Sequence, residues 1–294
     1  MNIQTSHFQE FFNEYVAVSV KNRSKVGKRM ADPKVCVSLN GTTVIELIDE
    51  AARANLAGAD LVEVRFDRLY LSKPEPTVTE DDDGRRRDSL PPQSEWPVLN
   101  FEDVEVDEAI ATFKEQIPLP VIFTVRPVRE GGYFAGTEEQ RIEILKKAIS
   151  NQVSWVDLEL SIDEGERKSL MDDAKSNKSS VIASHHDTSG TPTSADIITH
   201  IKDSSELGNI VKVCYKINEQ QDALQLVNAA EELKGEGLRH SIMGLGNGGD
   251  WVRLHAPALD QSLVYATMRD EYSLKNEGLV NIRDLRDAWL LLEY

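Results

Sequence analysis

Asn209-Ile-Val-Lys212-Val-Cys-Tyr215 places one lysine in the middle of an apolar run that is typical of a buried β-strand. Taken alone, the alternating residues also fit a strand with one face in water, because lysine is rarely buried without a partner. Polar residues lie in the same way on several other apolar runs, which favours a lysine inside the protein. A lysine in a low-dielectric interior loses proton affinity and becomes a nucleophilic amine. The stretch therefore predicts Schiff-base chemistry at Lys212.

Outward from this stretch, short β-branched runs alternate with helical patterns over most of the chain. The predicted strands are Val35–Leu39, Leu61–Arg65, Val121–Val125, Val156–Leu160, Val181–Ser184, Ile210–Tyr215, Ser241–Gly244 and Leu263–Ala266. Eight strands that alternate with helices predict an α/β protein whose parallel sheet closes into a (β/α)8 TIM barrel. The alternative is a doubly wound open sheet. That fold normally has a Gly-rich phosphate turn after its first strand, which Ser38-Leu-Asn-Gly41 is not.

The composition is that of an acidic, water-soluble protein. The 294 residues include 33 Lys and Arg against 50 Asp and Glu, which gives a formal net charge of -17. This charge argues against nucleic acid or an anionic membrane as the partner. No apolar run reaches the ~18 residues of a membrane span and no signal peptide is evident, so a cytoplasmic location is expected. Cys36 and Cys214 lie in apolar runs and predict small buried residues, with no disulfide or metal cluster.

Two segments lie outside the alternating pattern. Residues 1–33 form an N-terminal extension, in which the apolar spacing of Phe8 to Val16 predicts an amphipathic helix, followed by a basic linker. We expect this helix to pack against the barrel or a second subunit, so a homodimer is one expected assembly. Residues 34–294 form the barrel domain. Within it, residues 72–97 are a charged, proline-rich insertion without periodicity, which predicts a flexible flap or disorder on the catalytic face.

Side chains that can bind or react gather at the carboxyl ends of the predicted strands, where barrels of this kind carry their active sites. Each has a plainer explanation when taken alone. Glu63 and Arg65 share a strand face and fit a structural ion pair equally well. His185-His186 could be half of a metal site, but the chain has only 6 histidines and no H-x-x-x-H or Cys cluster. The loop Gly244-Leu-Gly-Asn-Gly-Gly249 lacks a P-loop ending and predicts a turn that passes close to a ligand.

Taken together, the order and spacing of these residues resemble type I 3-dehydroquinate dehydratases. The shared motifs are Glu63-Val-Arg65-Phe-Asp67, Phe123-Thr-Val-Arg126 with Glu130-Gly-Gly132, Val156-Asp-Leu-Glu159, Ser184-His-His-Asp187, Val211-Lys-Val213, Met243-Gly-Leu-Gly and Arg253. The resemblance runs from about Lys34 to the C-terminus, apart from the insertion. It implies a shikimate-pathway lyase that converts 3-dehydroquinate to 3-dehydroshikimate and water, with no metal and no cofactor.

The resemblance also implies a role for each candidate residue. Lys212 would form the imine, His186 would be the general acid and base, and Glu130 would orient His186. An imine makes the neighbouring C–H acidic enough for an imidazole with a pKa near ~6.5 to remove the proton. Arg253 would hold the substrate carboxylate, because its planar fork can bind both oxygens. The residues expected to contact the substrate are Glu63, Arg65, Arg126, Met243, Arg253 and Ser273.

One stretch departs from the family pattern, and two other functions stay open. The family loop Ser-Ala-Pro-Gly-Gln corresponds here to Ser273-Leu-Lys-Asn-Glu-Gly278, so either Glu277 or Leu279 takes the place of the glutamine that closes over the substrate. A class I aldolase acting on a sugar phosphate is one alternative, with the Gly-rich loop as its phosphate site. A catalytically silent metabolite-binding barrel is the other. Arg253 and the Ser-His-His-Asp motif favour the dehydratase.

Overall fold

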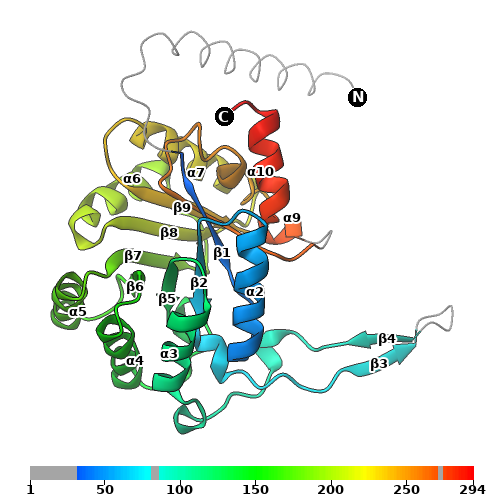
Figure 1. The fold of residues 1–294 in the computed structure, drawn as a ribbon. Helices are drawn as coiled ribbons and strands as arrows, with labels where there is room; N and C mark the ends of the chain where they lie inside the picture. Colours follow the sequence, from blue (N-terminus) through cyan, green and yellow to red (C-terminus); the bar gives the residue numbers. More distant parts are fainter. Residues whose placement is uncertain (1–31, 81–85, 271–273) are drawn as a thin grey trace. The chain divides into compact units, whose positions relative to one another are not determined.

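A parallel sheet of eight strands forms the centre of the protein (Figure 1). The computed structural model describes residues 32–80, 86–270 and 274–294. In sheet order the strands are β10 (Leu263–Ala266), β1 (Lys34–Ser38), β2 (Leu61–Arg65), β5 (Val121–Thr124), β6 (Trp155–Glu159), β7 (Ser180–Asp187), β8 (Ile210–Lys216) and β9 (His240–Leu245). Every ladder between these neighbours is parallel. The predicted TIM barrel is therefore confirmed, with β7 longer than predicted.

Helices connect consecutive strands and cover the outside of the sheet (Figure 1). Threonine side chains define several helix starts: Thr43, Thr137 and Thr193 each accept a hydrogen bond from a backbone N–H of the first turn. No helix in the described ranges is long and apolar enough to cross a membrane. The helices are α2 (Val44–Leu56), α3 (Val106–Gln116), α4 (Glu138–Ser150), α5 (Glu164–Ser176), α6 (Ser194–Asp203), α7 (Gln220–Leu233), α8 (Trp251–Leu254), α9 (Leu274–Glu277) and α10 (Ile282–Leu291).

Strand β8 is buried on both faces. Val211, Val213 and Tyr215 pack into the apolar layer that also contains residues of α6 and α7. Because side chains alternate along a strand, Lys212 and Cys214 point the other way, into the barrel. Lys212 is only 4% exposed. The alternative of a strand with one face in water is therefore wrong.

The ring of strands is nearly closed between β9 and β10. Within the described residues these two strands share no ladder, and other hydrogen bonds join them. The Ser262 N–H donates to the His240 carbonyl (2.9 Å), and the Ser241 hydroxyl donates to the Leu263 carbonyl (2.8 Å). The buried side-chain amide of Gln261 accepts a hydrogen bond from the Ile242 N–H of β9 (2.7 Å). This backbone donor is thus satisfied by a side chain in place of a neighbouring strand.

The insertion contains regular structure that the sequence did not predict. Strands β3 (Thr77–Glu80) and β4 (Arg86–Ser89) pair antiparallel, outside the barrel sheet (Figure 1). The two ends of the insertion are joined by backbone hydrogen bonds from Ser72 N–H to the Pro97 carbonyl and from Leu99 N–H to the Tyr70 carbonyl (both 2.8 Å), and the Trp96 indole donates to the Pro91 carbonyl (2.8 Å). The expectation of a structureless segment is wrong for these parts, because ladder pairing uses backbone groups and does not require apolar alternation. The helix predicted near the N-terminus lies outside the described residues.

Candidate active site

Lys212 is held inside the barrel by two carboxylates and an aromatic ring. Its Nζ lies 3.5 Å from Glu63 Oε1, 3.4 Å from Asp157 Oδ2 and 4.1 Å from the centre of the Tyr265 ring. The sequence predicted an apolar surrounding that would leave the amine neutral. The structure adds two carboxylates and an aromatic ring to that surrounding, each within 4.1 Å of the nitrogen that would attack a carbonyl carbon.

Arg126 is the centre of a buried ionic network beside Lys212. Nη2 donates to Asp157 Oδ2 (2.9 Å) and Nη1 donates to Glu159 Oε1 (2.9 Å). Arg141, which comes from α4, donates to the other oxygen of Glu159 (2.5 Å). Burial alone would raise the pKa of Asp157, but the charges of Arg126 and Lys212 outweigh it and lower that pKa. The network therefore keeps the Asp157 carboxylate charged next to the Lys212 nitrogen.

His186 and Glu130 form a second close pair at this end of the barrel. Its Nδ1 lies 3.3 Å from Glu130 Oε2, and the Ser161 hydroxyl donates to the other oxygen of Glu130 (2.5 Å). Burial, followed by the positive charges of Arg126 and Lys212, lowers the pKa of His186 well below 6.5. The imidazole is therefore neutral near neutral pH and can accept a proton. Glu130 lies where it can orient the ring, as the sequence resemblance implies.

His185 faces away from the barrel interior. Its ring lies 4.8 Å from the His200 ring and 5.9 Å from the Tyr215 ring, between centroids. Because neighbouring residues on a strand point to opposite faces, His185 and His186 do not converge on one ion. No group of three or more His, Cys, Asp and Glu side chains suited to a metal is found in the described residues.

Asp67 fixes the loop that carries Glu130. This fully buried carboxylate accepts two hydrogen bonds from Arg65 (2.9 and 2.8 Å) and two from backbone N–H groups, those of Arg126 (3.2 Å) and Tyr133 (3.0 Å). The loop folds back closely, because a Cβ on Gly132 would lie 2.0 Å from the Arg126 carbonyl oxygen. Asp67 thus sets both the direction of Arg65 and the path of the chain beyond Glu130.

The Arg253 side chain donates its hydrogen bonds to backbone carbonyls. Its Nη1 donates to the carbonyls of Gly244 (2.8 Å), Gly249 (2.6 Å) and Gly278 (2.5 Å), and its Nε donates to the Tyr265 carbonyl (3.1 Å). Nη2 makes no hydrogen bond within the described part of the chain. The Gly-rich loop after β9 is therefore wrapped around a guanidinium group, with one nitrogen left for a ligand. The carbonyl oxygens of Gly244 and Gly249 face the guanidinium, whereas a phosphate cradle is built from backbone N–H donors.

A hollow of about 350 Å³ opens at the carboxyl ends of β7, β8 and β9. Thr188, Lys216 and Leu245 line one part of it, and Glu277 and Leu279 line another. The Glu277 carboxylate is paired with the guanidinium of Arg269 (2.7 and 2.9 Å). Of the two residues considered for the position of the missing glutamine, Glu277 is thus engaged in an ion pair. Leu279 lines the same hollow without such a partner. Ser273 lies outside the described residues.

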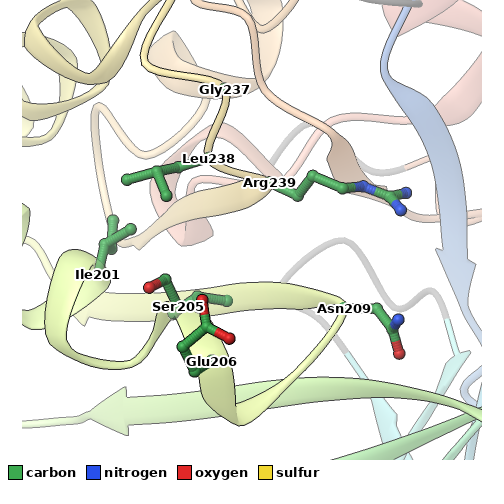
Figure 2. A pocket seen from close by; sticks show the side chains of 8 residues that line it. Ile201, Ser205, Glu206, Asn209, Gly237, Leu238 and Arg239 are labelled. Atoms are coloured by element: carbon green, nitrogen blue, oxygen red, sulfur yellow. The ribbon is translucent and has the colours of Figure 1, made fainter.

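A second hollow, of about 230 Å³, lies at the opposite end of the barrel (Figure 2). Gly237, Leu238 and Arg239 reach it from the segment that precedes β9, and Glu206 and Asn209 reach it from the segment that precedes β8. The amino ends of barrel strands serve stability, whereas chemistry is confined to the carboxyl ends. We therefore do not assign the reaction to this hollow.

The structure brings most of the predicted residues to one place and adds three others. Met243, a predicted substrate contact, is 1% exposed and pairs with Cys214 of β8. The added residues are Asp67, Asp157 and Tyr265. The sequence does point to Asp157, because this residue interrupts an apolar strand two positions before Glu159. Tyr265, in contrast, looks like an ordinary core aromatic in the sequence. The predicted residues found at this end of the barrel are Glu63, Arg65, Arg126, Glu130, His186, Lys212, Met243 and Arg253.

The fold and these contacts define a class: a (β/α)8 barrel with an interior lysine, flanked by carboxylates, beside a histidine–glutamate pair. The family model described as type I 3-dehydroquinase matches residues 35–293. The chain therefore belongs to the type I 3-dehydroquinase family.

Curated relatives agree with this assignment, and a solved structure shows the same fold. The 3-dehydroquinate dehydratase of Methanosarcina barkeri is 31% identical over 200 residues, which cover 67% of this chain and 82% of the relative. The 3-dehydroquinate dehydratase of Desulfotalea psychrophila is 26% identical over 258 residues, or 87% of this chain and 97% of the relative. A crystal structure of type I 3-dehydroquinate dehydratase from Clostridium difficile has the same fold, with a TM-score of 0.72 and 21% identity over 91% of this chain and 94% of that chain.

Proposed function

We propose that this chain is a 3-dehydroquinate dehydratase that works through an imine on Lys212. The observation that carries the proposal is the placement of Lys212, a buried lysine between Glu63 and Asp157, in the same barrel interior as the His186–Glu130 pair. The proposed route converts 3-dehydroquinate to 3-dehydroshikimate and water and uses no cofactor. The relatives named above carry the name of the same activity.

Imine formation begins with the loss of a proton from Nζ, for which Glu63 and Asp157 are the nearest acceptors. The nitrogen lone pair then forms a bond to the ketone carbon, and the carbonyl oxygen leaves as water. The nitrogen is left as a protonated imine, again a cation between two carboxylates. Arg126 keeps Asp157 charged throughout, so the site stabilises this cation without rearranging.

Elimination follows on the carbon next to the imine. His186 is neutral, so its free nitrogen can remove the C–H proton while Glu130 holds Nδ1. The electron pair moves into an enamine, and the hydroxyl on the next carbon leaves with a proton returned by His186. Water then hydrolyses the imine and releases the unsaturated ketone from Lys212. One water is consumed and two are released, which balances a net dehydration.

The substrate is an anion, and the site must attract it against an overall charge of -17. Arg253 Nη2 and the exposed part of Arg65, whose side chain is 17% accessible, are the cations placed to meet it. Arg126 is too enclosed by carboxylates for this role and braces the site. The proposal includes a role in the shikimate pathway of aromatic amino-acid biosynthesis, a cytoplasmic location and 3-dehydroquinate as the small-molecule partner.

Borohydride trapping tests the proposal. The protein is incubated with 3-dehydroquinate and borohydride, and the labelled peptide is identified by mass spectrometry. We expect a covalent adduct on Lys212 and loss of activity. Dihydroxyacetone phosphate in a parallel sample tests the aldolase alternative. An adduct with dihydroxyacetone phosphate and none with 3-dehydroquinate would favour the aldolase, and no adduct with either would favour a silent barrel.

Leu279→Gln is expected to lower KM for 3-dehydroquinate by about tenfold or less, with kcat unchanged. Leu279 lines the hollow at the carboxyl ends of β7, β8 and β9, and an added amide there can donate one hydrogen bond, which contributes about 0.5–1.5 kcal/mol net. Glu277→Gln is the comparison variant, because it breaks the ion pair with Arg269 and should help less. Steady-state kinetics give both constants. If neither variant changes KM, this loop does not cover the substrate.

A further inference from the structure

Tyr265 makes a contact that the proposed mechanism does not yet use. The residue lies in β10, opposite Cys36 of β1, and its ring faces the Lys212 nitrogen at 4.1 Å from the ring centre. A cation within ~6 Å of a ring face is attracted by the ring quadrupole. The Tyr265 carbonyl accepts a hydrogen bond from Arg253 Nε (3.1 Å), which holds the strand in place at this residue. The ring is therefore presented to Lys212 by a fixed backbone.

The hydroxyl of Tyr265 is buried and has no hydrogen-bond partner within the described residues. The side chain as a whole is 8% exposed. Burial, and then the nearby Glu63 carboxylate, raise the pKa of Tyr265 well above 10, so the hydroxyl keeps its proton and remains a donor. Buried polar groups nearly always have a partner, and an unsatisfied one is costly. A donor without an acceptor beside the reacting nitrogen indicates that a ligand supplies the acceptor.

We propose that Tyr265 is a positioning residue: its ring face holds the Lys212 nitrogen, and its hydroxyl donates to an oxygen of the bound substrate. This inference rests on the proposed function and deepens it. In the proposed reaction the nitrogen carries a positive charge as the protonated imine, after water is lost. The ring face, whose centre lies 4.1 Å from this nitrogen, can stabilise that cation. Glu63 and Asp157 attract the nitrogen from other directions, and the ring provides the third contact that fixes its position.

Two substitutions separate the two parts of this role. Tyr265→Phe keeps the ring and removes the hydroxyl, so we expect KM for 3-dehydroquinate to rise about three- to tenfold with kcat unchanged. Tyr265→Leu removes both groups. It should show the same rise in KM together with a kcat that is about 3- to 30-fold lower, because the nitrogen is no longer held. Borohydride trapping of the imine should slow in Tyr265→Leu only.

Tyr70 provides a matched control. Its hydroxyl is also buried without a partner in the described residues, but it packs in the outer apolar cluster with Phe66 and Phe134, away from Lys212. Tyr70→Phe should leave both kinetic constants unchanged. Thermal melting verifies that each variant is folded. If Tyr265→Leu does not fold, Tyr265→Met serves as a second variant without the ring.

The outcomes separate this inference from the function on which it rests. An unchanged KM in Tyr265→Phe, or a kcat in the ring-free variants equal to that of Tyr265→Phe, would overturn the role of Tyr265 while leaving the imine intact. Wild-type protein that forms no imine with 3-dehydroquinate would instead overturn the proposed function itself.

Discussion

Lys212→Ala is expected to lose the borohydride label and to reduce turnover of 3-dehydroquinate by about 10⁴-fold or more, as removal of other covalent nucleophiles does. The reason is that Lys212 is the lysine that lies beside both Glu63 and Asp157, so its removal takes away the proposed nucleophile. Trapping, intact-mass measurement and steady-state kinetics report the two losses separately. A label that persists in Lys212→Ala would show that the imine forms elsewhere.

The same substitution has a stability cost that must be separated from catalysis. Burial raises the pKa of Glu63, and Lys212 contributes most to lowering it again, so removal of the lysine leaves a buried charge without its nearest cation. Breaking a buried pair in this way costs about 3–5 kcal/mol. Lys212→Arg keeps a cation and should melt closer to the wild type, yet it cannot form the imine. Lys202→Ala, which removes a surface lysine paired with Glu236 on the outside of the barrel, should change neither property.

His186→Ala is expected to reduce kcat by about 10²- to 10⁴-fold, the usual contribution of a general acid and base. Imine formation depends on it less, so the variant should still accumulate trappable imine, although slowly. His185→Ala is the matched control, since that ring packs against His200 on the other face of β7. A dead His185→Ala together with an active His186→Ala would reverse the assignment of the pair.

The pH dependence of kcat/KM should reflect the ionisation of His186. Because the pKa of His186 is lowered well below 6.5, its imidazole stays neutral as the pH falls through 6.5. The acid limb of kcat/KM should therefore lie below pH 6.5. The sign for stability follows from linkage: below pH 6.5 the unfolded chain binds a proton at this histidine that the folded chain does not. The contribution of His186 to stability is thus complete above pH 6.5 and decreases as the pH falls below it.

The barrel could be predicted because its signal is repeated along the chain. Each strand needs only a short β-branched run and each helix an apolar stripe, so errors at one element do not change the architecture. Glu63, Lys212 and His186 could be placed in the site for the same reason, since period-two alternation assigns each to the barrel interior once the strand is known. The motif resemblance supplied their roles, which alternation alone does not.

Contacts between residues on distant strands could not be predicted from the sequence. Nothing local says that Asp157 meets Lys212, 55 residues away, or that Arg253 wraps the Gly-rich loop around its guanidinium group. The carboxylate neighbours of Lys212 could not be predicted for the same reason, because Glu63 and Asp157 come from other strands. The hairpin of β3 and β4 was missed because its pairing depends on backbone donors and acceptors, which every sequence has.

The joint between β9 and β10 has a consequence for altering this protein. The two strands are held mainly through Gln261 and Ser241, where neighbouring strands elsewhere are held by a ladder. Their spacing can therefore respond to a change of one side chain. Met243 lies on β9 and Tyr265 on β10, so this spacing sets the width of the interior beside Lys212. Directed evolution towards bulkier keto acids would do best to begin at Gln261 and Ser241, because these residues join the two strands while Tyr265 and Lys212 stay unchanged.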